Sequence, residues 1–557
     1  MEINDLIKKG YFPEEILPPF TSDDLLIVVD EVILNLDAFD PVEKRKKKLI
    51  TKLLPFSTPK IKGYRRNLAI PHPLHYIRLS NTIVNDWISI VDHCNKSKIS
   101  VSKLRVKKDT LRALVKPSFD LYIKERIIRS TGYRFLLRID ISRCYNSIYT
   151  HSIPWALHTK VISKAKRDRL ALLGNALDED SRKIQDGQTV GIPIGPDSSR
   201  IVSEIILSAI DVELDSVLKY LTGIRIIDDY FLYFKNLGDL EIARAVIQRT
   251  LKEFELELNQ SKERIVELPE VIESEWFNNL REFRFRNDWR AQRKDIISFF
   301  DKTFSYAKNF PDDLVLTYAM SKLRATIFHI KNWSILQSLL LNSLIIEPKI
   351  LPYIAQTLIS YDSKGYPLNE TIINSALEEF ILFHLSLNND FEVSWGLWIL
   401  KSLSITISEN VATQLSKTNN SVVVLVVLDL QQSGLIPAGL DTSEWESLLS
   451  AESLYSENWL LAYEAKQKGW LTTPVDYISK DPFFKMLKDN DVQFYKPERQ
   501  LDLTKVRVTS ASLSIGEFIS DDEAEAEEEE PESVFEAISP VKARSPFSDE
   551  GEDLPFI

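Results

Sequence analysis

Two adjacent acidic residues, Asp228 and Asp229, lie between two apolar runs rich in isoleucine, tyrosine and phenylalanine. Such residues favour strands, so the sequence predicts a hairpin over 223–234 with both acids at its tip. Two carboxylates side by side between apolar strands repel each other, which raises the pKa of one of them unless a cation binds between them. The pair therefore predicts a divalent-metal site. The alternative is a solvated turn that happens to carry two acids.

A third acid, Asp140, lies near the end of an apolar run over 135–141 that is typical of a buried strand. An acid in such a strand is costly unless it is paired or bound to a metal. The elements that follow are a glycine- and proline-rich loop, a helix, the hairpin, a helix and a strand, over 187–196, 197–221, 223–234, 238–257 and 258–266. This order predicts an α+β unit of ferredoxin-like type, whose central strands are adjacent and bring Asp140 beside Asp228 and Asp229. Three acids at one sheet edge predict a catalytic metal site.

Two further stretches have residue types suited to binding phosphate. Arg65 and Arg66 precede an extended segment, and their guanidinium groups match the oxygens of a triphosphate. Two exposed arginines without a ligand are the alternative. The glycine- and proline-rich loop allows a ligand to approach the backbone closely, and its candidate residues are Gly191, Pro193 and Gly195.

These motifs together resemble the fingers and palm of reverse transcriptases over about residues 60–270. The residues similar to motifs A, B, C and D are Asp140 with Tyr145, 191–196, Asp228 with Asp229, and Asn259 with Lys262. The family usually has tyrosine two residues before the paired acids, where this chain has Ile226. That difference leaves the metal ligands intact and changes the packing near the primer end.

The segment 149–155, Tyr-Thr-His-Ser-Ile-Pro-Trp, resembles the bacterial abortive-infection and unknown-group (AbiK- and AbiA-like) reverse transcriptases of phage defence. The resemblance implies a DNA polymerase that uses Mg²⁺, with Mn²⁺ as an alternative, and deoxynucleoside triphosphates. Synthesis would be RNA-directed or template-independent, with a DNA product that is free or covalently attached to the protein. It also implies RNA as a template or associated non-coding RNA, and a homo-oligomer. A palm kept as an RNA- or protein-binding platform with weak catalysis is the alternative.

Within that resemblance, Asp140 and Asp228 would bridge two metal ions, and Asp229 would support them. Tyr145 would meet the 2′ position of the incoming sugar and so select deoxynucleotides; an ordinary core position is the alternative. Lys262 would protonate pyrophosphate as it leaves; a solvated lysine is the alternative.

The second half of the chain predicts an all-α helical-repeat domain of HEAT-like type. Amphipathic helices are expected over 294–308, 314–330, 333–345, 349–359 and 370–387. Shorter helices are expected earlier in the chain, over 22–37, 43–54, 74–94 and 109–129. The predicted division is an N-terminal extension, reverse-transcriptase fingers and palm, helical domain and acidic disordered tail, at 1–60, 61–285, 286–505 and 506–557.

Composition separates the tail from the rest of the chain. Residues 521–557 carry 14 acidic and two basic residues, a net charge of −12 that equals the net charge of the whole chain. The tail is therefore expected to be disordered, and the rest is neutral overall. Basic residues at 44–48 and over 60–138 favour a surface for nucleic acid, with an ordinary solvated surface as the alternative. Two cysteines and no long apolar run predict a cytoplasmic protein without a membrane span.

A proline-rich element over 12–20 precedes these regions. Because proline stops regular secondary structure, we expect this element to lie extended over another surface of the protein.

Overall fold

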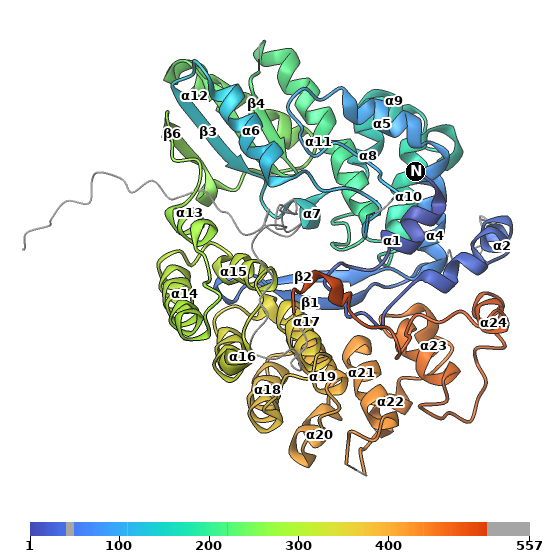
Figure 1. The fold of residues 1–557 in the computed structure, drawn as a ribbon. Helices are drawn as coiled ribbons and strands as arrows, with labels where there is room; N and C mark the ends of the chain where they lie inside the picture. Colours follow the sequence, from blue (N-terminus) through green and yellow to red (C-terminus); the bar gives the residue numbers. More distant parts are fainter. Residues whose placement is uncertain (40–48, 109, 220, 438, 509–557) are drawn as a thin grey trace, which may run out of the picture.

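The computed structural model describes residues 1–39, 49–108, 110–219, 221–437 and 439–508. They form two lobes, one holding a sheet with covering helices and the other built of helices (Figure 1). The basic run at 44–48 and the predicted tail from residue 509 onward lie outside the described residues. No helix within the described ranges is long and apolar enough to cross a membrane.

The mixed lobe is centred on a four-stranded antiparallel sheet with the strand order β4-β5-β3-β6. Its strands are β3 (Phe135–Asp140), β4 (Gly223–Ile226), β5 (Asp229–Phe234) and β6 (Arg264–Glu267). The predicted hairpin is present, and its second strand lies beside β3 as the ferredoxin-like arrangement requires. In the register of β3 with β5, Asp140 is opposite Asp229.

The sheet separates two hydrophobic cores, because successive side chains of a strand point to opposite faces. The helices that cover it are α11 (Asp197–Leu218) and α12 (Leu237–Glu253) on one face and α6 (Phe119–Ser130) on the other. Leu137, Ile139 and Leu232 are buried on the first face. On the other face, Phe231 packs against Tyr122 of α6, with ring centroids 5.6 Å apart.

The remaining elements of this lobe surround the sheet and add a small two-stranded sheet, β1–β2. They are α1 (Ile3–Lys9), η1 (Asp23–Ile27), α2 (Val29–Leu34), α3 (Leu36–Phe39), β1 (Leu54–Pro59), η2 (Ile61–Gly63), β2 (Arg65–Ile70), α4 (Pro73–Asn85), α5 (Trp87–Asn95), α7 (Cys144–Ser147), α8 (Ser152–His158), α9 (Lys160–Ala165), η3 (Arg169–Ala171), α10 (Leu173–Lys183) and η4 (Gln260–Lys262).

Two of the predicted short helices differ from the structure. Over 43–54, the described residues 49–53 are not helical and Leu54 begins β1, so the helix prediction is wrong there. Over 109–129, the helix starts only at Phe119. Ser118 caps it by accepting a hydrogen bond from the Leu121 amide (3.2 Å), a geometry that needs a non-helical residue at the cap.

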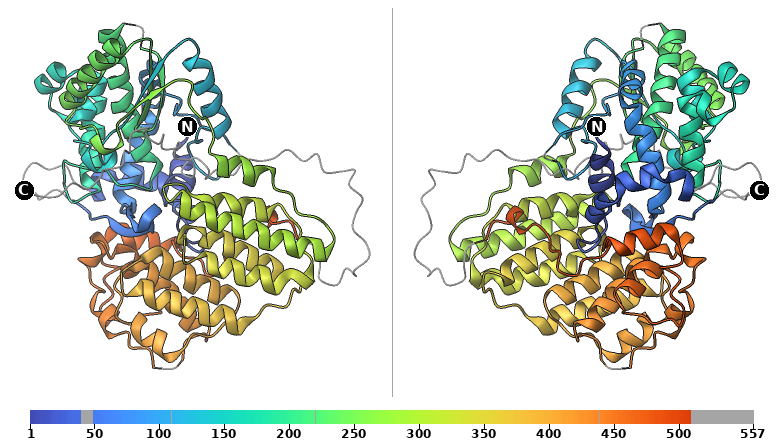
Figure 2. Two further views of the ribbon diagram at one scale, coloured as in Figure 1. Left: turned by 90° about the vertical axis from the view of Figure 1, so that its left-hand side faces the viewer. Right: turned by 90° about the vertical axis from the view of Figure 1, so that its right-hand side faces the viewer.

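The helical lobe follows the sheet directly. Its elements are α13 (Glu275–Glu282), α14 (Trp289–Asn309), α15 (Val315–Arg324), η5 (Ile330–Asn332), α16 (Trp333–Ser343), η6 (Pro348–Ile350), α17 (Leu351–Asp362), α18 (Glu370–Leu385), α19 (Asp390–Ser402), α20 (Glu409–Leu415), α21 (Ser421–Gln432), α22 (Ser443–Ser447), η7 (Ser453–Tyr455), α23 (Trp459–Gln467), α24 (Pro482–Asp489) and η8 (Leu503–Lys505). All five predicted helices are present, although the one expected over 314–330 ends at Arg324. The helices lie side by side (Figure 2), and a HEAT-like repeat stays a prediction.

The proline-rich segment 12–20 packs over another surface as expected, between the two lobes, but it forms turns and is not extended: the Ile16 amide donates to the Pro13 carbonyl (3.3 Å) and the Phe20 amide to the Leu17 carbonyl (3.1 Å). Trp395 of α19 donates a hydrogen bond from Nε1 to the carbonyl of Glu15 (2.9 Å). Leu17 and Phe20 are buried in a core that contains side chains of both lobes. The segment therefore joins the sheet lobe to the helical lobe.

Candidate active site

Three carboxylates meet at one edge of the four-stranded sheet. Asp140 is the last residue of β3, Asp229 opens β5 directly opposite it, and Asp228 lies in the turn between β4 and β5. Asp140 is buried, and the other two are partly buried. The fold thus brings together the three acids that the sequence singled out.

Burial and mutual repulsion change how these acids titrate. Burial, together with the charges of Asp229 and Asp140, raises the pKa of Asp228 to about 7. Burial and the charge of Asp140 also raise the pKa of Asp229, although Arg138 opposes this shift. Raised pKa values mean that the cluster lacks positive charge, and a bound cation would supply it.

Lys262 supplies part of that charge in the structure. Its Nζ forms an ion pair with Asp140 Oδ2, and the Asn259 amide donates to the Asp140 carbonyl (2.8 Å). Burial opposes the charged ammonium, but the hydrogen bond and charge of Asp140 outweigh it and raise the pKa of Lys262. The Lys262 side chain is 62% exposed, so it can also turn toward solvent or a ligand.

The donor set at this edge suits a hard divalent cation, because carboxylate oxygens are the ligands that Mg²⁺ and Mn²⁺ prefer. No group of three or more His, Cys, Asp or Glu side chains in the described part of the chain is already arranged around a metal position. The three acids fit the metal by the chemistry of their oxygen ligands and by their raised pKa values, and not by a preformed geometry.

Tyr145 and the predicted phosphate loop are packed together beside the acids. The Ile192 amide donates to the Tyr145 carbonyl and the Gly191 amide to the Ile148 carbonyl, both at 2.8 Å. Gly191 has a φ of 88°, and a Cβ there would lie 3.3 Å from the Asn146 carbonyl oxygen. The partly buried Tyr145 also accepts a hydrogen bond from Ser203 Oγ (3.2 Å). The glycine thus permits close contact between two predicted site segments.

Gly195 and Pro193 have packing roles in the same loop. Pro193 is buried. Gly195 has a φ of 129°, and a Cβ there would lie only 2.8 Å from Pro13 Cγ of the proline-rich segment. The small residue at 195 therefore lets the N-terminal segment approach, a reason for glycine that sequence reasoning did not find.

The two predicted arginines lie on β2, next to the helical lobe. Arg65 donates to both carboxylate oxygens of Glu392 and, through Nη2, to the carbonyl of Ser57 (3.0 Å). The backbone carbonyl of Arg66 accepts a hydrogen bond from Thr58 Oγ1 (3.4 Å). Most donors of Arg65 are therefore engaged within the protein.

Two cations near the acids were missed as site residues. Arg138 lies two residues before Asp140 on the same face of β3, over the ring of Phe231 at 5.2 Å. Lys60, directly after β1, is close enough to lower the pKa of Asp229. In the sequence, Arg138 could have been found because it is one of only two charged residues in an apolar run.

An antiparallel sheet with three carboxylates at one edge and helices behind it is the architecture of a nucleotidyltransferase palm. Residues 58–303 match the family model described as "Reverse transcriptase (RNA-dependent DNA polymerase)". These residues therefore form a reverse transcriptase domain, which indicates a nucleotidyltransferase of the RNA-directed DNA polymerase class.

Solved structures that resemble the chain include telomerases of two Candida species. Apo telomerase of Candida tropicalis truncated from its C-terminal domain is 13% identical, with a TM-score of 0.31 over 45% of this chain and 56% of that one. Apo telomerase of the same organism is 11% identical, with a TM-score of 0.31 over 77% and 75%. Telomerase of Candida albicans in complex with a telomeric RNA fragment is 13% identical, with a TM-score of 0.27 over 73% and 69%. No curated protein matches the sequence.

Proposed function

We propose that this protein is a Mg²⁺-dependent DNA polymerase that joins deoxynucleotides at the edge of its palm sheet. The observation that supports this most is the meeting of Asp140, Asp228 and Asp229, with two raised pKa values, inside a reverse transcriptase domain. Three such acids in one place repel one another, and binding of a cation would relieve that repulsion.

The three carboxylates would hold the metal ions, Mg²⁺ or Mn²⁺. When bound, these ions would lower the pKa of an attacking 3′ hydroxyl and stabilise the charge on departing pyrophosphate. Lys262 keeps its proton at neutral pH because Asp140 raises its pKa. Once a cation satisfies Asp140, the exposed ammonium of Lys262 is free to donate to the leaving pyrophosphate.

In this proposal, Tyr145 would select deoxynucleotides over ribonucleotides. Its hydroxyl accepts a hydrogen bond from Ser203 and its backbone carbonyl accepts one from the Ile192 amide, and both would keep the ring from moving aside for a 2′ hydroxyl. Arg65 would reach a triphosphate only by giving up its ion pair with Glu392.

The central test is nucleotide incorporation by the purified protein. The protein is incubated with each deoxynucleoside triphosphate and Mg²⁺, with and without RNA. We expect DNA product from the wild type, none from Asp228→Asn, and normal product from Asp301→Asn, which removes an exposed acid on α14. Product from Asp228→Asn at the wild-type rate would refute the assigned role. Label that stays on the protein after denaturation would show a covalently attached product, and dependence on RNA would show a template.

A catalytically weak palm that binds RNA or protein is the second candidate. Two observations favour it: Ile226 replaces the usual tyrosine before the acids, and Lys262 already pairs with Asp140. RNA binding by wild type and Asp228→Asn alike, with no incorporation by either, would support this candidate over the polymerase.

A role in antiphage defence and assembly into homo-oligomers complete the proposal. Both rest on the resemblance of segment 149–155 to defence-associated reverse transcriptases. Bacteria that produce the wild type should yield fewer phage plaques than bacteria that produce Asp228→Asn at the same level. Equal plaque numbers across a panel of phages would contradict the defence role.

A further inference from the structure

The turn that carries Asp228 contains a backbone conformation that isoleucine rarely adopts. Ile227 has a φ of 53°, in the left-handed region, where a β-branched residue is an outlier. In two-residue hairpin loops, a first turn position with positive φ is usually glycine. Such a conformation persists only where its surroundings hold it in place.

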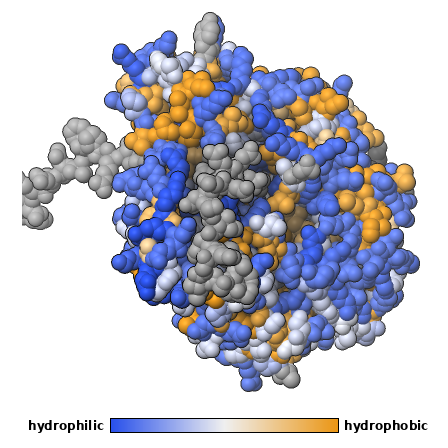
Figure 3. Space-filling model, in the orientation of Figure 1, coloured by the Kyte–Doolittle hydropathy of each residue, from blue (hydrophilic) through white to orange (hydrophobic). Residues whose placement is uncertain are grey.

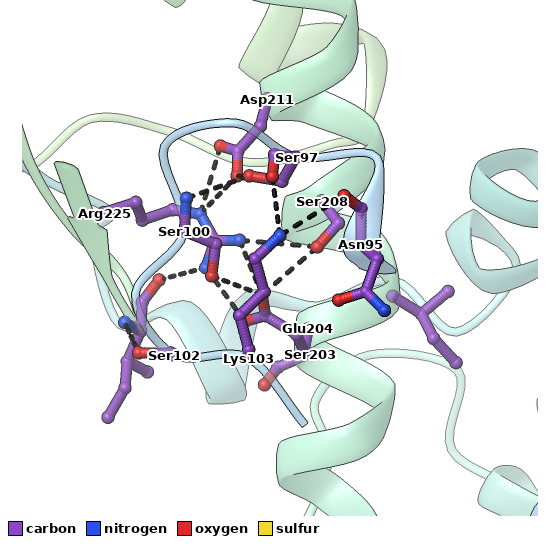
Figure 4. Close-up of polar contacts among 12 residues, drawn as sticks. Asn95, Ser97, Ser100, Ser102, Lys103, Ser203, Glu204, Ser208, Asp211 and Arg225 are labelled. Carbon is purple, nitrogen blue, oxygen red and sulfur yellow. Dashed lines mark hydrogen bonds and ion pairs between the residues drawn. The ribbon is translucent and has the colours of Figure 1, made fainter. Parts of the chain in front are cut away.

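Two side chains from outside the turn hold both polar groups of the Ile227 backbone. Arg225 donates from Nη1 to the Ile227 carbonyl (2.8 Å), and the Ile227 amide donates to Ser102 Oγ (2.9 Å). Ser102 belongs to the loop that follows α5 and runs beside β4 (Figure 4). Hydrogen bonds to Arg225 of β4 and to Ser102 of that loop therefore hold the turn in place.

Arg225 is itself fixed, because it is completely buried between two acids of α11. Its Nε donates to both oxygens of Asp211 (3.0 and 2.8 Å), and Nη1 and Nη2 donate to Glu204 (3.0 and 2.9 Å). Ser97 and Ser100 donate to these two acids in turn, at 2.6 and 2.7 Å. Figure 4 shows the guanidinium enclosed by these partners. A charge-assisted network of this kind leaves the guanidinium little freedom to move.

We propose that Arg225 and Ser102 are positioning residues, which hold the strained turn and thereby fix Asp228 and Asp229 opposite Asp140. For its effect on catalysis, this inference rests on the proposed function. For its effect on metal binding, it needs only the three carboxylates. The two hydrogen bonds to the Ile227 backbone connect the buried network with the site.

The test compares two variants of buried serines, one beside the turn and one on α9. Ser102→Ala removes the acceptor for the Ile227 amide. Ser163→Ala removes a hydroxyl that donates to the carbonyls of Pro154 and Thr159, both at 2.8 Å, and it leaves the network around Arg225 intact. Neither substitution removes a buried charge, so both proteins should fold. Binding of Mn²⁺ by isothermal titration, thermal unfolding, and kcat and KM for nucleotide incorporation are measured for each variant and the wild type.

Ser102→Ala should bind Mn²⁺ about tenfold more weakly, the factor that corresponds to one lost hydrogen bond. Its kcat should fall by a similar factor at unchanged KM, while Ser163→Ala keeps wild-type values. The Tm of the two variants should fall equally. Equal Mn²⁺ affinity in both variants would overturn the proposal. If the wild type makes no DNA, the proposed function fails, but Mn²⁺ affinity still decides on the positioning role.

A second substitution tests whether backbone strain at Ile227 is the reason that the turn needs these hydrogen bonds. Asparagine tolerates the left-handed region far better than isoleucine does. In an Ile227→Asn background, Ser102→Ala should therefore cost less than twofold in Mn²⁺ affinity. A cost that stays near tenfold would refute the role of strain at Ile227.

Discussion

Lowering the pH from about 8 to about 6 should weaken binding of Mn²⁺ to the palm acids about tenfold. Metal binding requires the ionised carboxyl, and the pKa of Asp228 is raised to about 7 by burial, then by Asp229 and Asp140. One pH unit above that value the carboxyl is about nine-tenths ionised, and one unit below it about one-tenth. Affinity should therefore be full above about pH 8 and fall tenfold per unit below about pH 7.

The same shift affects folding of the metal-free protein with the opposite sign. The folded pKa of Asp228 lies above its ordinary value of 3.8, so the folded state holds the proton more tightly than the unfolded chain. Stability should therefore fall as pH rises from about 4 to about 7, by up to about 4 kcal/mol. Asp228→Asn should remove this loss and raise the Tm of the metal-free protein at about pH 8.

Isothermal titration with Mn²⁺ at three pH values, combined with thermal unfolding, measures both effects. Asp301→Asn is the matched control, because Asp301 is exposed and should leave both pH profiles unchanged. The reasoning would be refuted by Mn²⁺ affinity that stays constant between about pH 6 and about pH 8. It would also be refuted by an Asp228→Asn protein that is less stable than the wild type at about pH 8.

Three other substitutions test single features of the site. Tyr145→Ala should increase incorporation of ribonucleotides relative to deoxynucleotides at least tenfold; an unchanged ratio would show that the ring does not meet the sugar. Lys262→Gln should lower kcat by about 10²-fold, the size of one general-acid contribution, and an unaltered kcat would exclude proton donation. Gly195→Ala should lower stability by about 1–3 kcal/mol through strain and the clash with Pro13. Gly132→Ala, at a positive φ in open space, separates the strain from the clash.

The acid cluster could be predicted from the sequence because each part of it is a local signal. Asp228 and Asp229 interrupt strand-forming residues, and Asp140 lies near the end of an apolar run. Once both segments are strands of one ferredoxin-like sheet, adjacency of the central strands brings the acids together. No long-range information beyond the order of the elements was needed.

Other features could not be predicted, because their partners are distant in the sequence. Arg65 pairs with Glu392, and nothing near either residue indicates the other. The buried network behind the turn is only weakly indicated by the sequence. Glu204 and Asp211 lie seven residues apart in a mostly apolar helix and therefore share a face. Two buried acids on one helical face require a buried cation, but only the fold shows that this cation is Arg225.

The proline-rich segment has a consequence for how the two lobes can be separated. It fills the space between them with Leu17 and Phe20, and it reaches the loop beside the acids through Pro13. A shortened chain that started at β1 would expose apolar surface on both lobes. It would also lack Pro13, the neighbour that Gly195 accommodates. The isolated reverse transcriptase domain should consequently aggregate, and adding back a peptide of residues 1–20 should restore part of its solubility.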